Sequence, residues 1–145
     1  MALIELRGIT KYYEMGNQVV KALDGIDIDV HKNDFLAFIG SSGSGKSTML
    51  NILGCLDKPS SGQYHLNGKN VESLEADELS EIRNLEIGFI FQSFNLLPRA
   101  TALGNVMQPL VYRGIAHRKR KEMAMEALQR VGLGDRTDHL PNQLS

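Results

Sequence analysis

The segment Gly40-Ser41-Ser42-Gly43-Ser44-Gly45-Lys46-Ser47 satisfies the pattern G-x-x-x-x-G-K-[ST] at every fixed position. A polyphosphate needs a concave set of backbone N–H donors, and glycines let the chain curl tightly enough to supply them. The helix expected to follow adds its free N-terminal amides and the positive end of its dipole. The pattern therefore predicts a phosphate-binding loop at the start of a helix.

The polar residues at the end of this loop have expected roles. Lys46 would reach the β- and γ-phosphates of a nucleotide, and the Ser47 hydroxyl would bind Mg²⁺. Thr48 would contribute its backbone amide. The predicted nucleotide-binding residues of the loop are Gly40, Ser41, Ser42, Gly43, Ser44, Gly45, Lys46, Ser47 and Thr48.

The flanking sequence supplies the strand–loop–helix context that the motif requires. Phe35 to Ile39 is an uninterrupted apolar run, which predicts a strand buried on both faces. After the loop, Met49, Leu50, Ile52 and Leu53 fit a helix packed on a sheet. The alternative, a flexible Gly/Ser loop that matches the motif by chance, is disfavoured by this context.

The rest of the chain divides into a strand-rich part and a helical part. Strands are expected at 3–6, 19–20, 26–30 and 63–66, with a turn at 16–17 and a second buried strand at 87–91. Helices are expected at 76–85, 102–112 and 118–131. We therefore predict an α/β fold: an incomplete P-loop NTPase core with N-terminal antiparallel strands over residues 1–92, and a helical subdomain over residues 93–145.

Composition excludes several classes of protein. The chain has 145 residues, about the size of one domain, and its net charge of −1 argues against an electrostatic nucleic-acid binder. One cysteine, Cys55, excludes an internal disulfide framework and is interpreted as a small apolar residue. The apolar runs fall far short of the roughly 20 residues of a spanning helix, and the N-terminus does not resemble a signal peptide. We expect a soluble, cytosolic protein.

Two polar features have ordinary structural interpretations. The basic run 117–121 opens an amphipathic helix, so a solvated face is favoured over a nucleic-acid patch. The histidines lie far apart and show no metal-ligand spacing. They are His31, His65, His117 and His139.

Further segments, taken with the phosphate loop, resemble the ATP-binding subunits of ABC transporters over the whole chain. Tyr13 lies where that family places an aromatic residue that stacks on adenine, although ordinary packing is the alternative. Phe89-Ile90-Phe91-Gln92 is similar to the family's Q-loop, whose glutamine approaches Mg²⁺ and the attacking water; a solvated loop residue is the alternative. Leu144 and Ser145 would be the first residues of the signature motif.

The segments 51–57 and 92–98 are similar to the subfamily that serves macrolide export and lipoprotein release. Ser41 stands where that subfamily often has proline. The resemblance implies ATP and Mg²⁺ as ligands, catalytic roles for Lys46 and Gln92, and Ser47 and Gln92 at the metal. It also implies a membrane-spanning transporter subunit, a second copy of the ATPase as partner, and a cytoplasmic location on the inner face of the cell membrane.

The hydrophobic residues after Gln92 have two interpretations. Phe94, Leu96 and Leu97 would form part of the surface that receives the membrane subunit, or they would pack in a core. Two other functions also stay open: a non-transport ABC ATPase acting in DNA repair or on ribosomes, and a nucleotide-binding module without turnover. The absence of a zinc-binding insertion and of a duplicated cassette disfavours the former.

Hydrolysis requires groups that this sequence lacks. In the family that the chain resembles, an apolar run ending in Asp-Glu supplies the Mg²⁺ carboxylate and the base, and no such run occurs here. We expect the natural protein to be longer and this chain to be an N-terminal fragment that binds ATP weakly, if at all, and does not hydrolyse it. The apolar edges 35–39 and 87–91 would then be less covered and would favour self-association.

Overall fold

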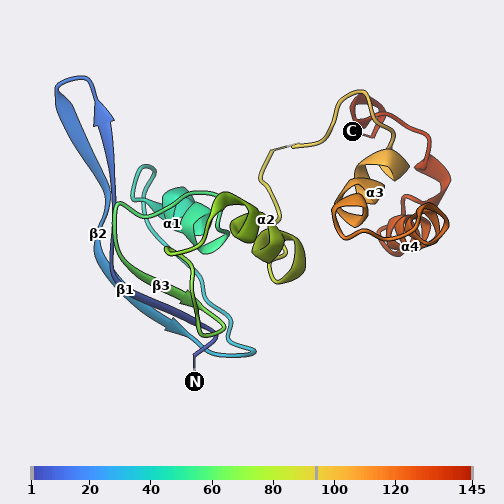
Figure 1. Ribbon diagram of the computed structural model, residues 1–145. Coiled ribbons are helices and arrows are strands. Elements are labelled where there is room, and N and C mark those ends of the chain that lie inside the picture. Colours follow the sequence, from blue (N-terminus) through green and yellow to red (C-terminus); the bar gives the residue numbers. More distant parts are fainter. Residues whose placement is uncertain (1, 94, 145) are drawn as a thin grey trace. The chain divides into compact units, whose positions relative to one another are not determined.

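The computed structural model describes residues 2–93 and 95–144. The chain divides into two compact units, residues 1–88 and 89–145, and each is described by itself (Figure 1). The first unit combines a β-sheet with two helices, and the second consists of helices and connecting loops.

The sheet of the first unit is antiparallel. Its strands are β1 (Ile4–Met15), β2 (Gln18–Val30), β3 (Ser61–Leu66) and β4 (Lys69–Asn70), in the order β2-β1-β3-β4. β1 lies between two partners, because Ile4 is opposite Val30 of β2 and also opposite Leu66 of β3. The predicted turn at residues 16–17 joins β1 to β2, and the predicted N-terminal antiparallel strands are confirmed.

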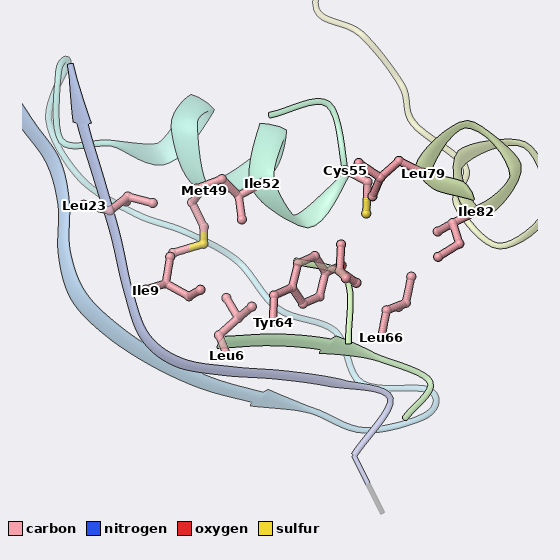
Figure 2. Close-up of a cluster of buried hydrophobic side chains, with 11 residues drawn as sticks. Leu6, Ile9, Leu23, Met49, Ile52, Cys55, Tyr64, Leu66, Leu79 and Ile82 are labelled. Atoms are coloured by element: carbon pink, nitrogen blue, oxygen red, sulfur yellow. The ribbon is translucent and has the colours of Figure 1, made fainter. Parts of the chain in front are cut away.

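Two helices pack on one side of this sheet. They are α1 (Lys46–Leu53) and α2 (Ala76–Leu85), both at their predicted positions. Figure 2 shows Met49 and Ile52 of α1 directed toward side chains of the strands, and Leu79 and Ile82 of α2 near the end of β3. The core contains these buried residues: Leu6, Ile9, Leu23, Met49, Ile52, Cys55, Tyr64, Leu66, Val71, Leu79 and Ile82.

Polar contacts fix the two helices on the sheet. The Tyr64 ring of β3 is fully buried, and its hydroxyl donates to the Leu53 carbonyl at the end of α1 over 2.9 Å. Burial raises the pKa of Tyr64, so this hydroxyl stays a hydrogen-bond donor. Arg83 of α2 donates from Nη1 to the Cys55 carbonyl over 2.8 Å, which joins α2 to the segment that follows α1.

The second unit contains α3 (Ala102–Tyr112), α4 (His117–Arg130) and two short 3₁₀ helices, η1 (Gly134–Arg136) and η2 (Pro141–Gln143). Thr101 caps α3 by accepting from the Gly104 amide over 3.1 Å. The helices agree with the predicted 102–112 and, within one residue, with 118–131. Across residues 2–93 and 95–144, no helix is both long enough and apolar enough to cross a membrane.

Two predicted strands are wrong. Residues 35–39 and 87–91 form no strand, and Phe35, Ile39 and Ile90 are at least 95% exposed. A strand needs a neighbour to accept its ladder of hydrogen bonds, and none of the strands in the described part of the chain pairs with either segment. Phe38 and Ile87 pack partly buried against the core, so hydrophobicity places single side chains of these segments there without making either segment a strand.

Candidate functional site

The predicted phosphate loop leads directly into the first turn of α1. The first backbone hydrogen bond of this helix runs from the Met49 amide to the Gly45 carbonyl over 2.8 Å. The amides of Lys46, Ser47 and Thr48 precede it, so the helix offers them no acceptor. Neither a side-chain cap nor an acidic residue is present in the first turn. This helix end therefore presents donors and positive potential to an anion.

Gly45 explains how the loop can reach its place against the sheet. Its φ of +87° lies in the left-handed region that favours glycine. A Cβ at this position would come within 2.3 Å of the Ala22 carbonyl oxygen and 3.1 Å of Leu23 Cδ2, both on β2. Only glycine therefore fits between the loop and β2 without displacing backbone.

Lys46 occupies the interior of the loop. Its Nζ donates to the carbonyl oxygens of Gly40 and Ser41 over 2.9 and 2.5 Å, and to Ser44 Oγ over 3.2 Å. The ammonium thus holds the loop curled around itself. Residues 40–48 include no carboxylate that would compete with an incoming anion for this charge.

The hydroxyl and amide donors at the start of α1 fit a magnesium–nucleotide complex. Ser47 is exposed, and the part of the chain that the structure describes contains no cluster of His, Cys, Asp and Glu that could hold a metal ion. Mg²⁺ commonly keeps few protein ligands and takes its other oxygens from water and substrate phosphates. A single hydroxyl beside bound phosphates is therefore a suitable protein ligand.

Tyr13 lies near the end of β1, in the same unit as the loop. Its hydroxyl donates to Asp57 Oδ2 over 3.2 Å, and Lys11 Nζ lies 5.2 Å from the centroid of its ring. Lys11 also forms an ion pair with Asp57 Oδ1 at 2.7 Å. Tyr13 stays 37% exposed, so the ring is held at its edge without being enclosed.

Asp57 is the centre of this arrangement. Burial raises its pKa, but Lys11, the backbone amide of Lys58 and the Tyr13 hydroxyl together lower it more strongly, so the pKa lies below its ordinary value. The carboxylate is therefore charged at neutral pH and accepts from all three donors. Sequence reasoning assigned no role to Lys11 or Asp57.

The spacing of Lys11 from Tyr13 in the sequence could have indicated that the two side chains lie together. Lys11 and Tyr13 are two positions apart, which places both on one face of β1. Asp57 follows Lys11 by 46 positions and has no such periodic signal.

The remaining predicted site residues belong to the second unit. Gln92 is exposed and follows the Phe89 and Phe91 rings, whose centroids are 4.6 Å apart. Leu144 follows η2 and is partly buried. Ser145 and Phe94 lie outside the described residues. The structure thus brings the phosphate loop and Tyr13 into one unit and places Gln92 in the other.

Known proteins match this chain over nearly its whole length. Residues 23–145 match the family model described as ABC transporter. The chain is 51% identical over 143 residues to the macrolide export ATP-binding/permease protein MacB 1/2 of Paracoccus denitrificans, covering 99% of this chain and 21% of that protein. It is 47% identical over 143 residues to the ABC transporter ATP-binding protein YknY of Bacillus subtilis, covering 99% of this chain and 62% of that protein.

A solved structure agrees with these sequence matches. The ATP-binding cassette MJ0796, determined as a dimer in a post-hydrolysis state bound to ADP and Pi, superposes with a TM-score of 0.91 at 42% identity. The match covers 98% of this chain and 63% of that one. The chain therefore spans less than two thirds of the length of these relatives.

Proposed function

This chain belongs to the ABC transporter family and has the fold of an ABC ATPase domain; on that premise we propose that it is the ATP-binding part of a transporter of the macrolide-export or lipoprotein-release type. The observation that carries the proposal is the uncapped start of α1 behind a loop that is curled around Lys46. Identities of 47% and 51% to YknY and MacB support the transporter type.

The loop would hold the triphosphate by exchanging hydrogen-bond partners. Lys46 now donates to neutral carbonyl and hydroxyl oxygens of its own loop. Phosphate oxygens carry negative charge, so the ammonium would gain a Coulombic attraction to them that neutral carbonyl and hydroxyl oxygens do not offer. The ammonium would therefore transfer to the β- and γ-phosphates, while the amides of residues 46–48 donate to the same anion.

Tyr13, Ser47 and Gln92 complete the proposed site. Tyr13 would stack on adenine, and its exposure at 37% leaves room for a base. Ser47 and Gln92 would hold Mg²⁺, which neutralises charge that develops on the phosphates during transfer. The functional boundary proposed at Gln92 separates the nucleotide-binding core, residues 1–92, from the helical subdomain, residues 93–145.

The proposed partners are a membrane-spanning subunit and a second copy of the ATPase. The exposed side chains of Leu96 and Leu97, at 43% and 51%, support a contact surface for the membrane subunit. MJ0796 is a dimeric cassette, which supports pairing of two ATPase domains. These partners would place the protein at the cytoplasmic face of the membrane.

Residues 1–145 would bind Mg-ATP without turning it over. They contain no apolar run ending in Asp-Glu, the source of a metal carboxylate and a base in the family. Measuring Mg-ATP binding and phosphate release by the purified chain tests both parts. We expect weak binding that Lys46→Ala removes, with no turnover; Lys32→Ala, which changes an exposed lysine outside the loop, should leave binding intact.

Robust turnover abolished by Lys46→Ala would overturn the proposal that this chain is inactive alone. Binding that survives Lys46→Ala would overturn the assignment of the phosphate loop.

A further inference from the structure

We propose that Lys11 and Asp57 form a positioning pair that fixes Tyr13 relative to the phosphate loop, so that the base and the triphosphate of one nucleotide are held at a set separation. This inference rests on the proposed function and names residues that would act on the nucleotide only through Tyr13.

The contacts at Asp57 use both oxygens of its carboxylate. Oδ1 accepts from Lys11 over 2.7 Å, and Oδ2 accepts from the Tyr13 hydroxyl over 3.2 Å. Lys11 also donates to the Lys58 carbonyl over 2.7 Å. Two side chains of β1 are therefore attached to the same short segment that follows α1.

This ion pair is better shielded from solvent than the other ion pairs formed by β1 and β2. The side chains of Lys11 and Asp57 are 14% and 34% exposed. The corresponding values are 48% and 45% for Arg7 and Asp29. Screening by water and salt weakens exposed pairs most, so the Lys11–Asp57 contact is the more persistent anchor.

The anchor constrains the Tyr13 ring in two ways. The hydroxyl is tethered to Asp57, and the Lys11 ammonium lies 5.2 Å from the ring centroid, within the range of a cation–π contact. A ring whose orientation is already fixed loses less conformational entropy when a base stacks on it. Preorganisation of this kind raises affinity for a nucleotide base without any direct contact from Lys11 or Asp57.

Helix α1 connects this anchor to the phosphate loop. The amides of Leu56 and Asp57 both donate to the Asn51 carbonyl, over 2.8 and 3.2 Å, which fixes Asp57 to the end of the helix. The eight residues of α1 span about 12 Å. The loop lies at one end of this rigid segment and the Asp57 anchor at the other, so the helix sets the distance between them.

The experiment compares two ligands, Mg-ATP and magnesium tripolyphosphate, because only ATP carries a base. Amide chemical shifts of the 145-residue chain report the dissociation constant of each. Base stacking on an aromatic side chain leads us to expect Tyr13→Ala to weaken ATP about tenfold, and Asp57→Asn and Lys11→Met to weaken it about fivefold. Tripolyphosphate binding should not change in any of them.

Two further variants separate positioning from general support of the fold. Asp29→Asn breaks an ion pair on the same sheet that does not contact Tyr13, and we expect it to change neither dissociation constant. In a Tyr13→Ala background, Asp57→Asn should cause no additional loss of ATP affinity, because the group that it positions is gone. The unfolding midpoint of every variant is measured beside these constants.

Equal losses of ATP and tripolyphosphate binding in both Asp57→Asn and Lys11→Met would overturn the inference, as would unchanged ATP affinity in these two variants. A wild-type chain that binds neither ligand would overturn the proposed function and the inference with it. Lys46-dependent binding of both ligands, combined with unchanged ATP affinity in the pair variants, would overturn the inference alone.

Discussion

Strand β3 and the segment Phe35–Ile39 lie in the same unit, but only β3 forms a strand with buried side chains. β3 has a mixed sequence, yet its Tyr64 and Leu66 side chains are only 1% and 5% exposed. Residues 35–39 are all apolar, yet Phe35 is 96% exposed and no strand forms. The difference is the neighbour: β3 pairs with β1 on one side and β4 on the other, so α1 and α2 can cover its face. Burial of a strand is decided by its partners as much as by its own hydrophobicity.

The largest expected effect is on the covered side of the sheet. Ile52 of α1 is fully buried in the core cluster, so Ile52→Ala should reduce the free energy of unfolding by about 2–5 kcal/mol. Urea denaturation followed by circular dichroism measures this loss. A loss below about 0.5 kcal/mol, typical of surface substitutions, would show that this core does not stabilise the unit.

The next effect separates two glycines of one loop. Gly45→Ala should destabilise the chain by about 3 kcal/mol, because its Cβ would collide with the Ala22 carbonyl of β2 in addition to the left-handed strain. Gly43→Ala shares the positive φ but meets nothing within 4 Å, so we expect about 1 kcal/mol. Equal losses in denaturation experiments would contradict the close approach of the loop to β2.

A smaller effect is expected from the charge on Asp57. Its pKa in the folded chain lies below the ordinary 3.8, so the charged carboxylate favours the folded state above that value, and this contribution disappears as the pH falls through the folded pKa. The difference in unfolding free energy between wild type and Asp57→Asn should therefore shrink on acidification below about pH 4. A difference that stays constant or grows would mean that the ion pair with Lys11 does not form.

The smallest effect on stability is expected in the exposed segment. Phe35→Ser should change the free energy of unfolding by less than about 0.5 kcal/mol, because the Phe35 side chain is almost fully exposed and stabilises no core. It should instead reduce self-association, since exposed apolar segments favour pairing between chains. Light scattering of concentrated wild type and variant measures this. A wild-type chain that stays monomeric at high concentration would contradict the expectation.

The elements that were predicted from the sequence are those whose signals are local. The positions of α1, α2, α3 and α4 and parts of β1, β2 and β3 follow from alternation, helical periodicity and turn residues, which act over a few residues. The short strand β4 and residues 7–15 of β1 were not predicted. The predicted strands at 35–39 and 87–91 were wrong because the hydrophobic pattern within a segment does not show whether a neighbouring strand exists to pair with it. The Lys11–Asp57 contact was missed because it joins positions 46 apart and is created by the packing of α1 on the sheet.

The local geometry of the loop at residues 40–48 was predictable for the opposite reason. Its chemistry is local: the amides, the glycines and Lys46 that a triphosphate needs are consecutive in sequence, and the structure places them at one helix start. The phosphate-binding role of this loop stays a proposal. The base-stacking role of Tyr13, which came from a resemblance, and the role of Gln92 stay proposals too.

The most direct test of the account is a titration of the chain with Mg-ATP, followed by amide chemical shifts residue by residue. We expect the largest shifts at millimolar ATP to fall on Gly43 to Thr48, and we expect Lys46→Ala to remove them while the rest of the spectrum is retained. An absence of shifts in this loop, or loop shifts that persist in Lys46→Ala, would contradict the claim that this loop holds the triphosphate.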